Sequence, residues 1–321
     1  MQKYIYLLAF GLLFFSCDKK SRTEREIQKI PVSMKVHRFE QAFFEAKLEN
    51  LAQVKSAYPD FFPVGYPDSF WVDKMQHPQW RELYVEVEKK YKNFESEKDD
   101  IEDLFKHIKY YFPKTKIPEI YTVIGDMDYL NKTIYAKNKL IISLELYLGK
   151  EHKFYSEFPA YIKQNFEQKQ ILSDIVSSYY FGAFPAPKDK ELLTLMIDKG
   201  KELYIKDLLL PKYSDADKIG YKEEQIKWCT ENEGYMWEYF VSNKMLYNTD
   251  SRLQNCFINP APFSKFYLEI DNETPGRVGQ WLGWQIVRSY MQNNEITVTQ
   301  LLKMDAKLLF ENSKYKPKKN E

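Results

Sequence analysis

The chain has 321 residues, 47 Lys and Arg against 46 Asp and Glu, and 17% aromatic residues beside only 11 glycines. The balanced charge argues against a nucleic-acid partner, for which a clustered basic face is expected, and the low glycine content excludes a propeller, a glycine-rich barrel and a low-complexity chain. We therefore expect a packed, largely helical body with a substantial hydrophobic core.

The first 17 residues have the layout of a bacterial lipoprotein signal. Lys3 supplies a positive charge, residues 4–15 are almost wholly apolar, and Ser16 is a small residue directly before Cys17. The apolar run is roughly a dozen residues long, which suits a signal peptide and falls short of the about 20 residues of a membrane-spanning helix. We predict a signal peptide at 1–16 and a diacylglycerol on the Cys17 thiol, which would tether the protein to a membrane. The alternative is a signal peptide or N-terminal helix with a chance cysteine.

Besides Cys17, the chain contains only Cys229 and Cys256. No Cys-x-x-Cys occurs, which excludes a thioredoxin-like or zinc-finger site. Cys229 and Cys256 could form a disulfide in an oxidising periplasm, or they could be two buried thiols.

The remainder is predicted to be a lipidated N-terminus and polar tether at 17–32, followed by a single, predominantly helical periplasmic domain at 33–321. A first helix is expected over 33–50, where apolar residues follow a helical spacing. Residues 59–80 hold four prolines among six aromatic side chains, which favours a rigid, aromatic-anchored loop. Helix is expected again over 81–112.

The pattern changes over residues 119–148. β-branched and apolar runs alternate there with turn signals at Gly125-Asp126 and Asn131-Lys132, which predicts two or three strands and the only substantial sheet. Helical spacing then returns and predicts helices at 158–181, 190–209, 222–246, 274–291 and 299–310. The predicted fold class is therefore α+β, mostly α-helical with a small sheet.

The order of strands followed by helices suggests a zincin-like peptidase scaffold. Such an enzyme carries His-Glu-x-x-His on a helix, so that two imidazoles bind Zn²⁺ and the Glu activates the metal-bound water. Laid on the helix at 171–181, the motif places Ser173 and Ser177 at the histidine positions and Asp174 at the glutamate position. Lys199, on the next helix, falls where a third ligand would stand. Hydroxyls and an ammonium group cannot hold Zn²⁺, so we predict a degenerate metal site with no metal or other cofactor.

Two other interpretations of these polar residues stay open. A simple amphipathic helix with a polar edge of Ser and Asp would give the same pattern. A hydrolase would need several carboxylates in one cleft, for which Asp174, Glu231 and Glu233 are the candidates. Because these glutamates have no histidine partner, a solvated helix face explains them better, but Glu233 is kept as a candidate lining residue of the degenerate cleft.

The helix at 274–291 has two marked features. Thr274 is expected as its N-cap and Pro275 as its first helical residue. Gly279 and Gly283 lie four residues apart on it, and we expect them to let a neighbouring element approach the helix backbone closely.

Asp305 lies on the apolar stripe of the last predicted helix. A carboxylate on a buried face needs a partner. We predict that Asp305 is buried and paired with Arg277 or Arg288, in a structural role.

Five stretches carry a family resemblance: the leader, IISLELYLGKEHKFY (141–155), ENEGYMWEYFVSNKMLYNTD (231–250), INPAPFSKFY (258–267) and PGRVGQWLGWQIVRSYM (275–291). Together they resemble the gliding-motility lipoprotein family GldB of Bacteroidota, over nearly the whole mature chain. The resemblance implies a membrane-anchored lipoprotein that is needed for gliding over surfaces. The members of that family have no established enzymatic activity. The resemblance also implies a distant relation to zincin-like peptidases, which keep the metal motif.

The resemblance thus favours a non-catalytic protein of the cell envelope that faces the periplasm, on either the inner or the outer membrane. Its expected partners are the membrane, through Cys17, and proteins of the gliding or secretion machinery. The degenerate cleft or the aromatic segment 59–80 would present the partner surface. Alternatives are a lipid-anchored peptidase or cell-wall hydrolase with an atypical active site, and a solute-binding lipoprotein, although the chain lacks the two-lobed βαβ pattern of the latter.

Overall fold

A small sheet organises the N-terminal half of the chain. The computed structural model describes residues 22–318, and its strands lie in the spatial order β1-β2-β4-β3. β1, β2 and β4 are parallel neighbours, whereas the edge strand β3 runs antiparallel to β4. The strands are β1 (Val36–Arg38), β2 (Glu119–Val123), β3 (Thr133–Ala136) and β4 (Lys139–Ser143). The prediction of two or three strands within 119–148 is confirmed, and β1 adds a further strand.

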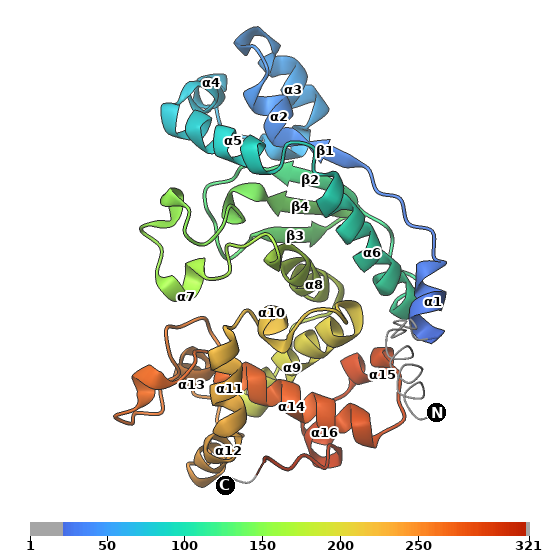
Figure 1. Ribbon diagram of the computed structural model, residues 1–321, viewed down its shortest axis with the longest axis vertical. Helices are drawn as coiled ribbons and strands as arrows, with labels where there is room; N and C mark the ends of the chain where they lie inside the picture. The colour runs from blue at the N-terminus through green and yellow to red at the C-terminus, as the bar shows by residue number, and fades with distance from the viewer. Residues whose placement is uncertain (1–21, 319–321) are drawn as a thin grey trace, which may run out of the picture.

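Helices surround this sheet and enclose the first hydrophobic core. Figure 1 shows α6 crossing the sheet and α8 lying beside the edge strand β3. The core contains large side chains with almost no exposed surface, such as Tyr91, Phe105 and Tyr147. The helices of this half are α2 (Phe39–Phe44), α3 (Leu51–Ala57), α4 (Asp68–Gln76), α5 (Pro78–Lys90), α6 (Glu95–Tyr111), α7 (Ala160–Lys163) and α8 (Gln170–Ala183).

The C-terminal half is helical and has a second hydrophobic core. The long helices α9 and α14 pack against each other at its centre, and the shorter helices lie around them (Figure 1). Trp284 and Phe240 are fully buried in this core. The helices are α9 (Leu192–Leu209), α10 (Asp215–Ile219), α11 (Glu223–Glu231), α12 (Glu233–Ser242), α13 (Ser251–Phe257), α14 (Val278–Asn293), α15 (Val298–Lys303) and α16 (Ala306–Asn312). The observed fold is thus α+β, mostly helical with a small sheet.

Glycines bring the backbones of α9 and α14 into direct contact. A Cβ atom added at Gly283 would lie 1.8 Å from the carbonyl oxygen of Met196, and one at Gly200 would lie 2.3 Å from the carbonyl oxygen of Gly283. On the same helix, a Cβ atom at Gly279 would lie 2.9 Å from the carbonyl oxygen of Phe257. The predicted close approach at Gly279 and Gly283 is therefore confirmed.

Part of the predicted tether packs against the body instead. Residues Arg22–Gln28 form α1, in which Ile27 is only 2% exposed. The Gln28 side-chain amide donates to Asp103 of α6 at 2.7 Å. The predicted signal peptide 1–16 and Cys17 lie outside the described residues. Within residues 22–318, no helix is both long enough and apolar enough to cross a bilayer.

Proline-containing segments were assigned wrongly from sequence. The predicted loop at 59–80 contains α4 and the start of α5, with Pro67 at the N-cap of α4 and Pro78 as the first residue of α5. Proline fits these positions because its fixed φ suits the first turn and its missing N–H costs no helical hydrogen bond. The predicted helix at 33–50 is also wrong in part, since β1 precedes the short α2.

Several predicted helices are interrupted. The helix at 158–181 is divided into α7 and α8, that at 222–246 into α11 and α12 with Asn232 between them, and that at 299–310 into α15 and α16. α14 begins at Val278, because Arg277 is its N-cap with a left-handed φ of 66°, so the prediction of Thr274 as N-cap is wrong. The prediction for 190–209 is confirmed by α9.

Asp305 is exposed, so its predicted burial and pairing with Arg277 or Arg288 are wrong. It is the N-cap of α16, and its side chain accepts hydrogen bonds from the backbone N–H groups of Lys307 and Leu308, at 2.9 and 3.1 Å. The physical reason is the helix break before it: a carboxylate at a helix N-terminus satisfies free backbone donors.

Cys229 and Cys256 are both buried free thiols. Burial raises the pKa of the Cys229 thiol far above its ordinary value.

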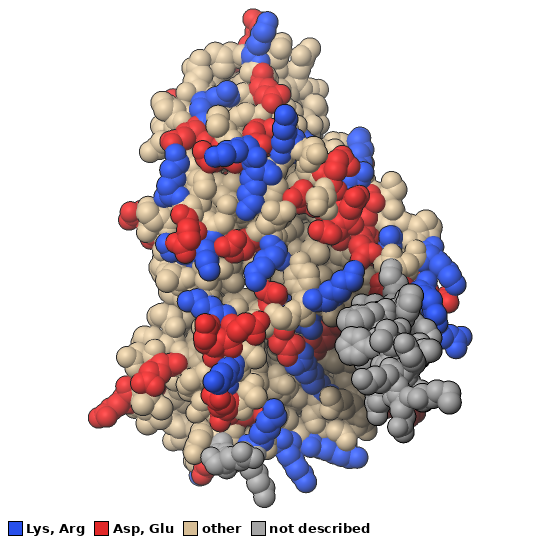
Figure 2. Space-filling view, in the orientation of Figure 1, with Lys and Arg blue, Asp and Glu red and all other residues tan. Residues whose placement is uncertain are grey.

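On the face that Figure 2 shows, the described Lys and Arg side chains are interspersed with Asp and Glu, as the balanced composition predicts.

Candidate functional site

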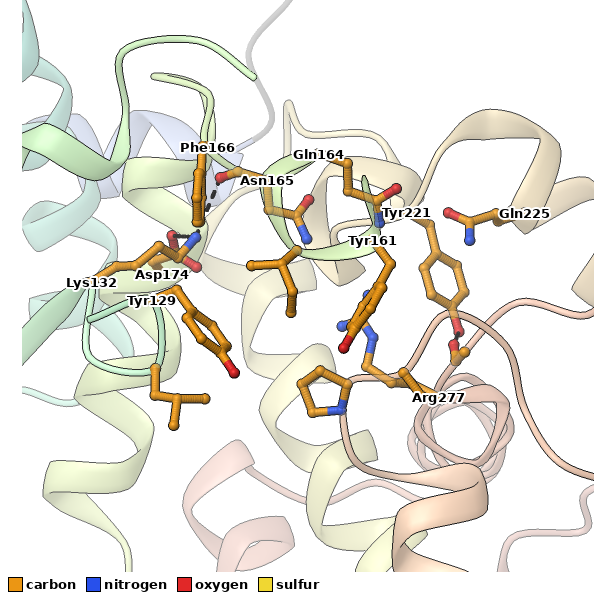
Figure 3. Close-up of a pocket in the computed structure, with 15 residues that line it drawn as sticks. Tyr129, Lys132, Tyr161, Gln164, Asn165, Phe166, Asp174, Tyr221, Gln225 and Arg277 are labelled. Atoms are coloured by element: carbon orange, nitrogen blue, oxygen red, sulfur yellow. Dashed lines mark hydrogen bonds and ion pairs between the residues drawn. The ribbon is translucent and has the colours of Figure 1, made fainter. Parts of the chain in front are cut away.

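A cleft opens between the sheet half and the helical half. It consists of two adjoining cavities, of about 220 Å³ and about 410 Å³, that share Tyr129, Leu130, Lys132 and Asp174. The smaller cavity reaches across to Arg277 of the helical half, as Figure 3 shows. The larger cavity follows β3 and α8. Two structural units therefore contribute to one site.

Asp174 and Lys132 form an ion pair at the centre of the cleft. Lys132 Nζ lies 2.5 Å from Asp174 Oδ2, and the Tyr147 hydroxyl donates to the same oxygen at 2.8 Å. Lys132 also donates to the carbonyl oxygen of Asn165 at 3.3 Å (Figure 3). Burial and the neighbouring Asp174 carboxylate raise the pKa of Tyr147 well above its ordinary value, so its hydroxyl keeps the proton that it donates. The pair thus joins the start of β3 to α8.

The two serines of the predicted degenerate motif face α9. Ser173 is 1% exposed, and its hydroxyl donates to the carbonyl oxygen of Lys218 at 3.1 Å while accepting from Lys206 Nζ at 3.0 Å. The Ser177 hydroxyl donates to Glu202 Oε1 at 2.6 Å. Ser177 lines the larger cavity, whereas Ser173 is sealed behind it. Of the predicted cleft residues, Asp174 and Ser177 therefore reach the cleft.

Two ammonium groups hold the buried Glu202 carboxylate. Lys199 Nζ lies 2.8 Å from Glu202 Oε2, and Lys206 Nζ lies 3.8 Å from Glu202 Oε1. Burial alone would raise the pKa of Glu202, but Lys199, Lys206 and the hydrogen bond from Ser177 outweigh it and lower the pKa to about 2. Burial lowers the pKa of Lys206, and the Glu202 carboxylate opposes that shift. We call these side chains the α8–α9 ion network; its members are Ser173, Ser177, Lys199, Glu202 and Lys206.

The α8–α9 ion network does not fit a zinc ion. Its only carboxylate is already neutralised by lysine ammonium groups, and protonated lysines repel a cation. Among residues 22–318 there is no group of three or more His, Cys, Asp and Glu side chains that could hold a metal ion. No step of a metal-assisted reaction can therefore be assigned to these residues.

The network does not present an activated serine either. Ser173 and Lys206 are close enough for a Ser–Lys pair, but Ser173 is buried and its proton points to the Lys218 carbonyl. Ser177 is open to the cleft, but its acceptor is Glu202, and a carboxylate with a pKa of about 2 is a weak general base. The geometry favours structural hydrogen bonds for both hydroxyls.

Glu233 lies outside the cleft, which corrects its placement there. Its side chain is buried in the helical half and accepts a hydrogen bond from the Tyr315 hydroxyl at 2.8 Å. The interpretation as a solvated helix face holds for the exposed Glu231 but is wrong for Glu233. Glu233 lines neither of the two cavities that Asp174 lines.

Arg277 and Arg288 have separate roles. Arg277 lines the smaller cavity and donates to the carbonyl oxygens of Ile219 and Gly220, at 3.0 and 3.2 Å. Arg288 lies in the helical half, where Asp207 accepts from its guanidinium at 2.7 Å. Both arginines stabilise loops or helices around α10, and Arg277 also faces the cleft.

Sequence reasoning missed several residues of the site, among them Lys132, Glu202 and Lys206. Glu202 and Lys206 are four residues apart on α9, and Lys199 precedes Glu202 by three, so their pairing on one helix face is readable from sequence. Lys132 pairs with a residue on another element, and no local pattern predicts that contact.

A family model described as gliding motility protein GldB matches residues 20–317. The chain belongs to this family. The resemblance that the sequence stretches indicated is thereby confirmed, and membership ties the chain to gliding motility. No curated protein and no solved structure is significantly similar to it.

Proposed function

We propose that this GldB-family chain is a lipid-anchored, non-catalytic protein of the cell envelope that supports gliding motility by binding partners. The α8–α9 ion network is the observation that carries the non-catalytic part. On the proposed zincin-like scaffold, Ser173, Ser177 and Lys199 would occupy the positions of the metal ligands, and they are engaged instead with the buried Glu202 carboxylate and with Lys206. A site that is filled by its own charges has no open position for substrate or water.

The proposed scaffold is that of a zincin-like peptidase whose metal site has degenerated. Its support is the arrangement of elements: the antiparallel edge strand β3 lies beside α8, which carries the degenerate motif, and α9 follows with Lys199. The cleft between β3, α8 and the helical half would then remain as a binding surface without catalytic groups.

A second surface suits protein partners. Val64 is fully exposed, and Tyr66 and Phe70 are 50% and 42% exposed, with ring centres 4.8 Å apart. These residues belong to the aromatic segment 59–80 and form an apolar patch at the start of α4. Exposed aromatic and aliphatic side chains in a cluster are typical of protein contact sites.

The proposed lipid anchor is attached to Cys17, and the sequence of the leader before it is the first support for this proposal. The name of the matching family model, GldB_lipo, marks a lipoprotein family and supports this part of the proposal. α1 begins at Arg22, so the lipidated residue would lie within about 18 Å of the folded body along the chain. The protein would therefore be held close to the membrane surface.

The proposal is tested by the spreading of cells on a surface. Deletion of the gene should abolish spreading, and the wild-type gene should restore it. Cys17→Ser should fail to restore it because the anchor is lost, whereas Asp18→Asn, which keeps the thiol, should restore it. Ser177→Ala should also restore it, since no serine nucleophile is required. Normal spreading of the deletion strain, or failure of a stably folded Ser177→Ala variant, would contradict the proposal.

A further inference from the structure

We infer that the cleft around Lys132 and Asp174 binds a saccharide. The inference deepens the proposed function, since it rests on that cleft being a binding site and names the class of its ligand. Three properties of the cleft support it: unused hydrogen-bonding groups, aromatic walls and a nearly neutral charge.

The Lys132–Asp174 ion pair has hydrogen-bonding groups that the protein itself does not use. Lys132 Nζ and the Tyr147 hydroxyl both contact Asp174 Oδ2, and no hydrogen bond within residues 22–318 uses Oδ1 of this cleft-lining residue. Lys132 uses two of its three N–H groups, on Asp174 and on the Asn165 carbonyl. One acceptor and one donor are thus fixed side by side. A sugar hydroxyl both donates and accepts, so a pair of this kind can satisfy it fully.

Further polar groups around the cavity have no partner among residues 22–318. These are the hydroxyls of Tyr129 and Tyr161, the side-chain amide of Asn165 and Nε2 of Gln225. In Figure 3 the Tyr129 and Tyr161 rings lie on either side of one hollow and the Asn165 side chain lies between them, whereas Gln225 lies farther along the cavity, beside Tyr221. A ligand with several hydroxyl or amide groups that extends along the cavity would meet these groups in turn.

The walls of the cavity suit the faces of sugar rings. Tyr129 is 39% exposed and Tyr161 is half-buried, so both rings are accessible. The C–H face of a pyranose carries partial positive charge and packs against the negative face of an aromatic ring. Apolar walls with a few convergent polar groups are the usual composition of a small-molecule site.

The charge of the cavity limits the ligand to a neutral or singly acidic sugar. The Lys132–Asp174 pair is neutral overall. Arg277 adds one positive charge, and no carboxylate among the described residues pairs with it. A strongly anionic ligand would meet only this one uncompensated cation, whereas a single carboxylate on a sugar would match it.

An extended peptide fits the same cleft less well. In β3, Thr133 and Tyr135 direct their backbone groups away from β4, because the alternate residues make the ladder to β4. Ser178 accepts from the Tyr135 N–H at 2.6 Å, and α8 approaches the Tyr135 carbonyl so closely that a Cβ atom on Gly182 would lie 2.7 Å from it. A peptide could thus pair only with Thr133, which is too short a ladder for strand addition.

The test is ligand binding by the purified full-length protein in detergent, measured by saturation-transfer NMR and calorimetry. The probes are chitotetraose, maltotetraose, a lysozyme-released disaccharide that contains muramic acid, and an unstructured alanine-rich peptide. Binding of the amino-sugar probes would point to a cell-wall glycan, and binding of maltotetraose to a neutral hexose polymer. Either result supports the inference, whereas binding of the peptide alone, or of no saccharide at millimolar concentration, overturns it.

Variants localise the binding to the cleft. Tyr129→Ala/Tyr161→Ala should bind the saccharide roughly tenfold or more weakly, because two stacking surfaces are lost. Asp174→Asn should also weaken it, whereas Tyr66→Ala, which removes an exposed ring outside the two cavities of the cleft, should not. Equal binding by the double variant and the wild type would overturn the inference. Because binding is measured on isolated protein, its result is independent of the spreading of cells.

Discussion

Two buried carboxyl groups have opposite surroundings: Glu145 in the sheet half, and Glu202 on α9, which faces α8. Glu145 has no exposed surface, and neither of its carboxyl oxygens has a hydrogen-bond partner of good geometry within residues 22–318. Burial raises its pKa to about 8, and the nearby backbone amides of Gly125 and Glu145 counter this only in part. Glu202 is held by Lys199, Lys206 and Ser177, and its pKa is about 2.

The comparison shows that the hydrogen-bond and ion-pair partners of a buried carboxyl group determine whether it is protonated or charged. Glu145 remains protonated at neutral pH and acts as a polar group that the core tolerates, whereas Glu202 remains charged and joins two helices.

The largest effect is expected from Lys206→Met. It leaves Glu202 with one ammonium group and removes the donor to Ser173, so unfolding in urea should show a loss of about 3–5 kcal/mol. Lys227→Met is the matched control, because Lys227 is exposed and Glu231 is its only ion-pair partner in the described part of the chain. The stability of this variant should differ from that of the wild type by less than about 0.5 kcal/mol. A Lys206→Met protein as stable as the wild type would show that the network is not structural.

Glu145→Gln should change the pH dependence of stability. A carboxyl with a raised pKa contributes stability that is fully present below the unfolded value of 4.5 and is lost as the pH rises through about 8. From about pH 5 to about pH 8, the wild type should lose about 3 kcal/mol that the variant keeps. Exposed Glu269→Gln is the control and should follow the wild type. Parallel pH profiles for wild type and Glu145→Gln would contradict the assignment.

The smallest loss of stability is expected from Asp305→Ala. The Asp305 carboxylate differs from both buried carboxyls because it caps a helix at the surface. Asp305 is exposed, and its partners are two backbone N–H groups at the start of α16. Loss of this N-cap should lower the free energy of unfolding by about 1 kcal/mol. Thermal unfolding would measure it, and a loss as large as that of Lys206→Met would mean that Asp305 has a buried partner after all.

Local patterns predicted much of the fold. The apolar spacing of 190–209 located α9, and the β-branched runs of 119–148 located three strands, because both signals lie within one element. Prolines at helix starts and the breaks that divide the shorter helices were missed, since the same residues occur in loops. Asp305 shows the cost of one missed break: on a continuous helix it faces the core, but at a helix start it caps free N–H groups.

The candidate site was predictable only where its residues lie on one helix at a spacing that can be compared with a known motif. Ser173, Asp174 and Ser177 could be compared with a known motif, but the motif gave no indication that Asp174 and the serines face different neighbours. The Lys132–Asp174 pair depends on how the edge strand β3 lies beside α8, and Glu233 depends on a contact with the C-terminal tail. Such contacts are set by tertiary packing, which a single sequence does not display.

The central claim is that the α8–α9 ion network replaces a metal site in a non-catalytic protein. It is tested most directly by the metal content of the purified full-length protein, measured by inductively coupled plasma mass spectrometry after dialysis against zinc-containing buffer. The account predicts transition metal well below one ion per chain, in the wild type and in Glu202→Gln alike. One zinc ion per chain in the wild type that is absent from Glu202→Gln would contradict the account and support a metallopeptidase.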